Sequence, residues 1–266
     1  MPRQKKINPA VLYFPERIQT ALGYLKDFPL TVAHAPGGFG KTTALNRFFA
    51  HAVPKSTPVY VHTFLTGQAQ VSWNAVCKLI AQVDAHCAEE LLAIGVPDQD
   101  SIPAVAETLE NLECAEEAYI VLDRFEASGL PQPERRLEAL SRHGGECLHV
   151  VALTRRLAAG VLLANHRIYL LEADTFAFRA EDTEAYFKKA GLSVSRSRVL
   201  AVHQATDGWV MALHMQIMAY IKYGDFSGAG VDQLMQQVLW DSLSEAERGF
   251  FLSVSIFPRF TLTQAC

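Results

Sequence analysis

Five short apolar runs, rich in β-branched residues, alternate with longer segments of helical period in the first part of the chain. A strand that is buried on both faces needs such a continuous run, and two parallel strands need a connection of helical length between them. The alternation therefore predicts a parallel sheet covered by helices. The runs are residues 30–34, 58–63, 118–123, 148–154 and 167–171, and the helices expected between them are residues 41–50, 73–94, 103–113 and 133–141.

The pattern changes after about residue 176, where runs of strand type give way to successive helical segments. Ser244, three residues before Glu247, matches the capping box that begins a helix. A chain of 266 residues is long enough for more than one domain. We expect an α/β domain over residues 1–175, an all-α domain over residues 176–243 and a further unit from residue 244. The predicted helices are residues 181–190, 195–206, 209–222, 231–243 and 245–254.

The overall charge and composition argue against nucleic-acid and membrane partners. Half of the residues are apolar, and 24 basic against 28 acidic residues give a formal net charge of -4. This balance argues against a nucleic-acid-binding surface within the chain, because such domains are basic. No stretch approaches the roughly 18 to 20 apolar residues that span a bilayer, and no apolar signal-peptide core follows the basic first residues. We expect no membrane partner and a cytoplasmic location.

The most specific motif lies between the first apolar run and the first helix. Residues 35–43 read Ala-Pro-Gly-Gly-Phe-Gly-Lys-Thr-Thr. Glycines allow the backbone to turn tightly and to direct successive N–H groups at one anion, in front of the positive end of the following helix. This context predicts a phosphate-binding loop, although Ala35 stands where the usual pattern has its first glycine. The alternative is a glycine-rich turn that binds nothing.

Within this loop Lys41 would reach the β and γ phosphates of a bound nucleotide, and the Thr42 hydroxyl would bind Mg²⁺. We therefore predict ATP or ADP with Mg²⁺ as the cofactor. The predicted nucleotide-binding residues of the loop are Gly37, Gly38, Phe39, Gly40, Lys41, Thr42 and Thr43.

An acidic residue at the end of a buried strand would complete the magnesium site. Asp123 ends the run of residues 118–123, so that Thr42 and Asp123 are the predicted metal ligands. Many hydrolysing enzymes of this kind have a second carboxylate next, which polarises the attacking water. Arg124 occupies that position, and Glu126 is the nearest alternative base. We expect at most a slow ATPase, or one that needs a group from another domain.

Arg155 follows the fourth apolar run, and its guanidinium could reach the γ-phosphate. The alternative is a solvated surface arginine. Asp123, Glu126 and Arg155 are the candidate catalytic residues.

Several blocks in order resemble the nucleotide-binding region of the large ATP-dependent LuxR-type transcriptional regulators, the MalT-like branch of the STAND signal-transduction ATPases. The blocks are residues 14–18, 35–43, 119–123, 153–155, 178–187, 206–213 and 243–260, which span nearly the whole chain. The resemblance implies a P-loop NTPase fold with a five-stranded, mainly parallel sheet in the AAA-like order 5-1-4-3-2. A helical domain and the start of a winged-helix domain over residues 244–266 would follow.

The resemblance also implies roles for single residues. Lys41 and Thr42 match the Walker A pair, Asp123 the Walker B acid and Arg155 the sensor arginine. The following residues match further nucleotide contacts, the first two beside the base and ribose and the last two in the helical domain: Pro15, Arg17, Gly208 and Trp209. For Trp209 the alternative is a core position at the start of an apolar helix.

The function implied is a nucleotide-gated switch. ADP would keep the domains closed, ATP would allow opening and self-association, and slow hydrolysis would reset the state. The inducer and DNA would bind only through regions outside this chain. We expect the chain to be part of a longer protein. Two alternatives remain open: an AAA-type motor with steady ATP turnover, and a structural module that holds nucleotide without hydrolysis.

Overall fold

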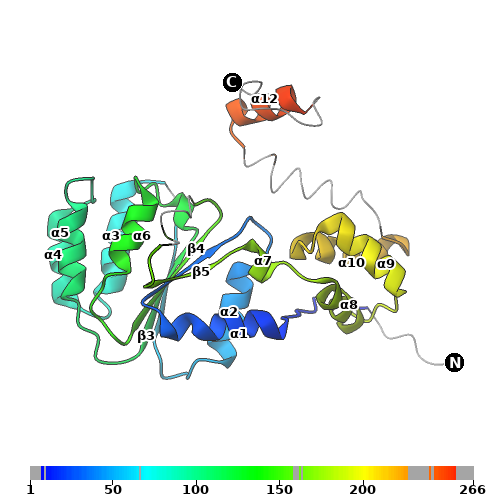
Figure 1. The fold of residues 1–266 in the computed structure, drawn as a ribbon, viewed down its shortest axis with the longest axis horizontal. Helices are drawn as coiled ribbons and strands as arrows, with labels where there is room; N and C mark the ends of the chain where they lie inside the picture. Colours follow the sequence, from blue (N-terminus) through cyan, green and yellow to red (C-terminus); the bar gives the residue numbers. More distant parts are fainter. Residues whose placement is uncertain are drawn as a thin grey trace. The chain divides into compact units, whose positions relative to one another are not determined.

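The computed structural model describes residues 7–8, 10–65, 67–157, 162, 164–226, 240 and 243–255. The chain divides into two compact units (Figure 1). One unit is Phe14–Phe178, and the other combines Met1–Tyr13 with Arg179–Cys266. The domain boundaries expected at residues 175 and 243 remain predictions.

The first unit is built on a parallel sheet of five strands. The strands are β1 (Leu30–His34), β2 (Val59–Thr63), β3 (Ala118–Asp123), β4 (Leu148–Thr154) and β5 (Ile168–Leu171). They lie in the order β2-β3-β4-β1-β5, and every pair is parallel. All five predicted strands and the expected order 5-1-4-3-2 are confirmed. This order places β1 between β4 and β5, so that the carboxyl ends of β1, β3 and β4 meet at one edge.

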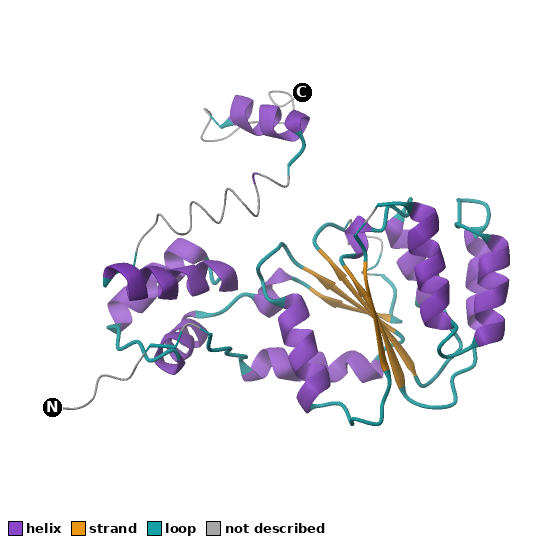
Figure 2. Ribbon diagram, turned by 180° about the vertical axis from the view of Figure 1, so that it is seen from behind, coloured by secondary structure: helices purple, strands orange, loops and turns teal. Residues whose placement is uncertain are grey.

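Helices cover both faces of this sheet (Figure 2). The helices α1 and α2 lie on one side, where the ring of Phe49 contacts that of Tyr119 at 5.2 Å. The helices α3 to α6 lie on the other side. The bounds are α1 (Glu16–Gly23), α2 (Lys41–His51), α3 (Ala69–Ile80), α4 (Ala85–Ile94), α5 (Ile102–Glu110), α6 (Pro133–Leu140) and α7 (Ala173–Phe176), with short 3-10 turns η1 (Tyr24–Asp27) and η2 (Phe125–Ala127).

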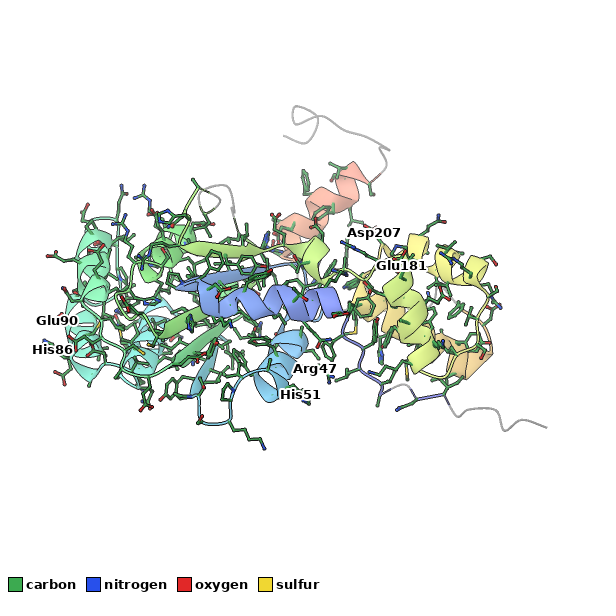
Figure 3. All side chains as sticks on the ribbon, turned by 60° about the horizontal axis from the view of Figure 1, so that its bottom comes forward. Arg47, His51, His86, Glu90, Glu181 and Asp207 are labelled. Carbon is green, nitrogen blue, oxygen red and sulfur yellow. The ribbon has the colours of Figure 1, made fainter. Side chains whose placement is uncertain are left out.

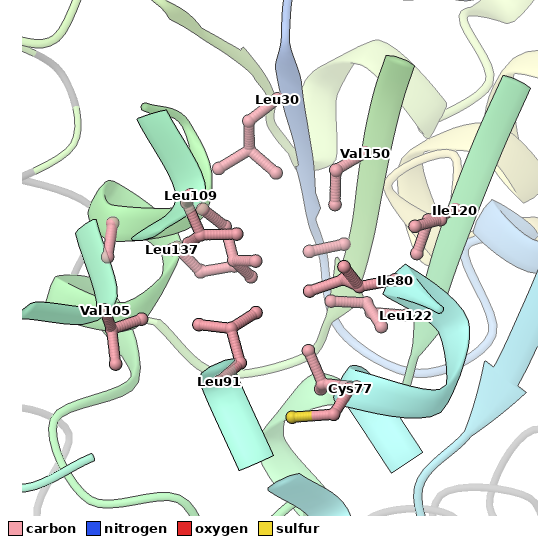
Figure 4. Packing of buried hydrophobic residues seen from close by; sticks show 14 of the residues in the cluster. Leu30, Cys77, Ile80, Leu91, Val105, Leu109, Ile120, Leu122, Leu137 and Val150 are labelled. Carbon is pink, nitrogen blue, oxygen red and sulfur yellow. The ribbon is translucent and has the colours of Figure 1, made fainter. Parts of the chain in front are cut away.

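The main core lies between the sheet and the helices α3 to α6 (Figure 4). Leu30 and Ile120 are the register partners of Val150 on the two neighbouring strands, and all three point toward this side, because paired residues share one face of a sheet. Ile80 of α3 and Leu109 of α5 pack against them, both nearly inaccessible to solvent. This core fixes the strand ends that bear the polar residues.

The prediction of one helix over residues 73–94 was wrong. The chain forms two helices, α3 and α4, because Asp84 begins a new one. The Asp84 carboxylate accepts hydrogen bonds from Cys87 N and Glu113 N, each at 3.0 Å. A capping side chain satisfies the free N–H groups of a helix start, which compensates for the break. Exposed His86 and Glu90 lie one turn apart on α4, 3.5 Å from each other (Figure 3).

The helix α1 was not predicted. Its buried Ile18 and Leu22 are one turn apart, and Pro15 precedes its first residue. A single pair of this kind is too short a pattern to identify a helix from periodicity.

The second unit is helical. Its described helices are α8 (Ala180–Lys189), α9 (Arg196–Thr206), α10 (Val210–Tyr223) and α12 (Glu245–Val254). Tyr186, Phe187 and Leu213 are buried within it. The capping box before α12 is confirmed, since Ser244 N donates to Glu247 Oε2 at 2.8 Å and Glu247 N donates to Ser244 Oγ at 3.3 Å. Most of the helix expected over residues 231–243, and the winged-helix segment after residue 255, lie outside the described residues.

Among the helices of the described residues, none is both long and apolar enough to cross a membrane.

Candidate nucleotide-binding site

The glycine loop joins the end of β1 to the start of α2. Gly38 and Gly40 have positive φ angles of 80° and 81°. A Cβ atom on Gly40 would meet no atom of the described residues within 4 Å, so the requirement for glycine there comes from the backbone conformation. Ala35 N donates to Thr154 O at 3.2 Å, which ties the start of the loop to the end of β4. The loop therefore has the turn that its sequence predicts.

Lys41 is the first residue of α2 and is only 9% exposed. Its ammonium donates to the carbonyl oxygen of Ala35 and to that of Pro36, the latter at 3.1 Å. Burial lowers the pKa of Lys41 from 10.5 to about 8; the carboxylates of Glu126 and Asp123 act against this and the Arg155 guanidinium adds to it. The ammonium is thus held within the loop, where a bound anion would stabilise its buried charge.

Thr42 and Asp123 meet although 81 positions separate them in the sequence. The Thr42 hydroxyl lies 3.3 Å from Asp123 Oδ1. The start of α2 and the end of β3 bring them together, because both follow the same edge of the sheet. A hydroxyl and a carboxylate side by side are suitable donors for Mg²⁺, which prefers oxygen ligands and retains several waters. The residues present fit the predicted metal.

Glu126 and Arg155 also meet, from η2 after β3 and from the end of β4. Arg155 N donates to Glu126 Oε2 at 3.1 Å, and Arg155 Nε lies 3.6 Å from Glu126 Oε1. The side chain of Arg155 is 46% exposed and that of Glu126 is 18% exposed. Nothing in the sequence indicated this pairing, because the two residues become neighbours only through the alignment of β3 and β4.

Arg124 occupies the position where many hydrolysing enzymes of this kind have a second acid. Its φ angle of 57° is in the left-handed region, which a non-glycine residue rarely adopts. Its Nε is buried and has no hydrogen-bond partner among the described residues. The backbone turns sharply at this residue, and Ala127 N donates to Arg124 O at 2.7 Å. After the turn Phe125 is buried in the core, and Glu126 reaches Arg155 at the end of β4.

Pro15 and Arg17, predicted beside the base and ribose, lie at the start of α1. Pro15 is buried. The Arg17 guanidinium donates to three carbonyl oxygens around α7, that of Thr175 at 2.7 Å, that of Asp174 at 3.4 Å and that of Ala177. Arg17 therefore joins α1 to α7, and its contact with nucleotide remains a prediction.

The other predicted residues are placed as follows. Gly37 and Phe39 are half-buried within the loop, and Thr43 is exposed on the first turn of α2. Gly208, with a φ angle of 69°, and Trp209 precede α10 in the helical unit. Their contact with nucleotide remains a prediction.

No protein-family model and no curated protein matches the chain. Among solved structures, a Walker-type ATPase of Pyrococcus abyssi is similar with a TM-score of 0.54 and 15% identity, over 96% of this chain and 81% of that one. A STAND protein with a tetratricopeptide repeat sensor, from Pyrococcus horikoshii, has a TM-score of 0.52 and 14% identity. That alignment covers 97% of this chain but only 37% of the STAND protein.

Likeness at this level of identity concerns the fold. Together with the parallel sheet, its strand order and the loop between β1 and α2, it defines the class: the chain has the α/β fold of the P-loop ATPases.

Proposed function

We propose that the chain is the ATP- and ADP-binding switch module of a LuxR-type transcriptional regulator of the STAND class. The observation that supports nucleotide binding best is the meeting of Thr42 with Asp123, at 3.3 Å, beside the buried ammonium of Lys41. An ammonium and a hydroxyl from the start of α2, with a carboxylate from the end of β3, are the groups that a magnesium-bound polyphosphate requires.

The residues of the loop have separate tasks in this proposal. The backbone N–H groups around Gly38 and Gly40 and the positive end of α2 attract the phosphates. Lys41 exchanges its carbonyl acceptors for phosphate oxygens, which compensates for the burial of its charge. Thr42 and Asp123 would hold the magnesium ion, which would supply positive charge against the phosphates.

The proposal includes slow hydrolysis. Arg124 replaces the carboxylate that would polarise water, and Glu126 faces Arg155 with both carboxylate oxygens. A nucleotide that is hydrolysed slowly can keep the protein in one state for a long time. Contacts between the γ-phosphate and Lys41 or Arg155 would then favour one state by about 1 to 3 kcal/mol, a common coupling energy for two linked sites.

The regulator role and self-association in the ATP state are the finer part of the proposal. They are supported by the sequence blocks that resemble those of LuxR-type regulators and by likeness to a STAND protein with a tetratricopeptide repeat sensor. In this proposal the inducer and DNA are bound by other parts of a longer protein.

Calorimetric titration with ADP and with ATP, each in the presence of Mg²⁺, tests nucleotide binding. Lys41→Ala is expected to abolish binding of both. Lys26→Ala is the matched control, because Lys26 is an exposed lysine next to the amino end of β1, away from the loop. Unchanged affinity of Lys41→Ala would refute the proposal.

Two further measurements separate the switch from its alternatives. Mass spectrometry of copurified nucleotide is expected to find ADP, whereas a guanine nucleotide would contradict the family assignment. Steady-state phosphate release is expected to be slow. Brisk release would favour a motor, and complete absence of release would favour a structural module.

A further inference from the structure

The pairing of Glu126 with Arg155 has the geometry of a clamp. One carboxylate oxygen accepts the backbone N–H of Arg155 at 3.1 Å, and the other lies 3.6 Å from its Nε. The same side chain therefore fixes both the backbone and the guanidinium of one residue.

This clamp lies within the electrostatic field of the phosphate loop. The charges of Glu126, Arg155 and Asp123 all act on the buried Lys41 ammonium. Arg155 is 46% exposed, so its guanidinium has room to change partners, while the less exposed Glu126 is held by η2. A γ-phosphate bound at the loop would compete with Glu126 for Arg155. A nucleoside diphosphate has no such group.

We propose that Glu126 is a positioning residue that sets the preference between ATP and ADP by holding Arg155 away from the γ-phosphate position. This inference rests on the proposed nucleotide site. To follow a γ-phosphate of ATP, the Arg155 guanidinium would have to give up the Nε ion pair with Glu126, whereas ADP would leave the pair intact. Glu126 thus lowers the affinity for ATP relative to ADP, and it does so as a restraint on Arg155 and not as the base that activates water.

The central experiment measures the ratio of ATP to ADP affinity by calorimetry with Mg²⁺ and a non-hydrolysable ATP analogue. Glu126→Gln retains an acceptor for Arg155 N but removes the charge that holds Nε. The ratio is expected to rise about three- to fivefold, as fits an ion pair of this exposure. Glu110→Gln is the matched control, because it breaks the 3.7 Å pair with Arg142 without touching Arg155.

Glu126→Gln also removes a negative charge near the phosphate loop, which raises the affinity for any anionic nucleotide. ATP gains more than ADP from this effect because it carries more negative charge. The Arg155→Ala background separates this field effect from the clamp. If Glu126 acts through Arg155, the ratio changes much less there on Glu126→Gln. An equal factor in both backgrounds, or no change in either, overturns the inference. So does an unchanged ratio with slower phosphate release, since that result would identify Glu126 as a base.

Glu126→Asp gives a second route if Glu126→Gln does not fold. It retains the charge but is one methylene too short to reach both the N–H and Nε of Arg155. We expect the ratio to rise in this variant too. In the nucleotide-free protein, hydrogen exchange of the Arg155 amide is expected to be faster in Glu126→Ala than in Glu126→Gln, and equal rates would contradict the clamp.

Failure of the inference differs from failure of the proposed function. If the unmutated chain binds both nucleotides but Glu126 does not affect their ratio, only the clamp is refuted. If it binds neither, the nucleotide site and the clamp both fail.

Discussion

The buried ammonium of Lys41 makes the stability of the nucleotide-free chain depend on pH in a way that can be calculated. The pKa of Lys41 falls from 10.5 to about 8 because burial disfavours its charge. At about 1.36 kcal/mol per pH unit, holding the protonated lysine in the folded state costs about 3 kcal/mol at pH 7. The unfolded chain binds this proton more tightly than the folded chain, so stability rises as the pH increases from about 8 to 10.5.

Lys41→Met tests this reasoning, because methionine fills a similar volume without a charge. Between pH 7 and pH 9.5 the free energy of unfolding of the unmutated chain is expected to rise by about 2 kcal/mol more than that of Lys41→Met. The titration of all other groups is common to both chains and cancels in this difference. The variant also loses the hydrogen bonds to Ala35 O and Pro36 O, and any change of these bonds with protonation is already contained in the lowered pKa of Lys41. Only the difference between the two pH profiles is therefore diagnostic.

The assay is urea denaturation of both chains at several pH values, without nucleotide and at constant ionic strength. Lys26→Met, at an exposed lysine, is the control and should follow the unmutated profile. Parallel profiles for the unmutated chain and Lys41→Met would refute the claim that burial destabilises this charge.

Two further substitutions test other parts of the structure. Asp123→Asn is expected to make nucleotide affinity nearly independent of Mg²⁺, because the carboxylate beside Thr42 is lost. Nucleotide titrations in Mg²⁺ and in EDTA measure this effect, and an unchanged dependence on Mg²⁺ would place the metal elsewhere. Asp84→Ala removes the cap of α4 and its hydrogen bond from Glu113 N, so the free energy of unfolding is expected to fall by about 1 to 2 kcal/mol in urea denaturation. Asp100→Ala is the control at an exposed aspartate, and equal stability of Asp84→Ala and the unmutated chain would contradict the capping role.

Most of the first unit was predicted from two sources, which gave different information. Hydrophobic periodicity gave the positions of the strands, and the family resemblance gave their order in the sheet. The apolar runs located β1 to β5, since a strand buried on both faces is encoded by a few adjacent residues. The strand order came from the resemblance, because a pattern along the chain does not specify which strands become neighbours. Periodicity failed over residues 73–94, where apolar residues continue across the cap at Asp84 and hide the end of α3.

The sequence by itself determined the glycine loop between a strand and a helix, because its positive φ angles and its lysine depend on adjacent residues. Only the tertiary structure decided which distant side chains share the site. Thr42 meets Asp123 across 81 positions, and Arg155 meets Glu126 across 29, because β1, β4 and β3 lie side by side. Such pairs depend on strand order and register, which are set by packing of the whole sheet and not by any local pattern.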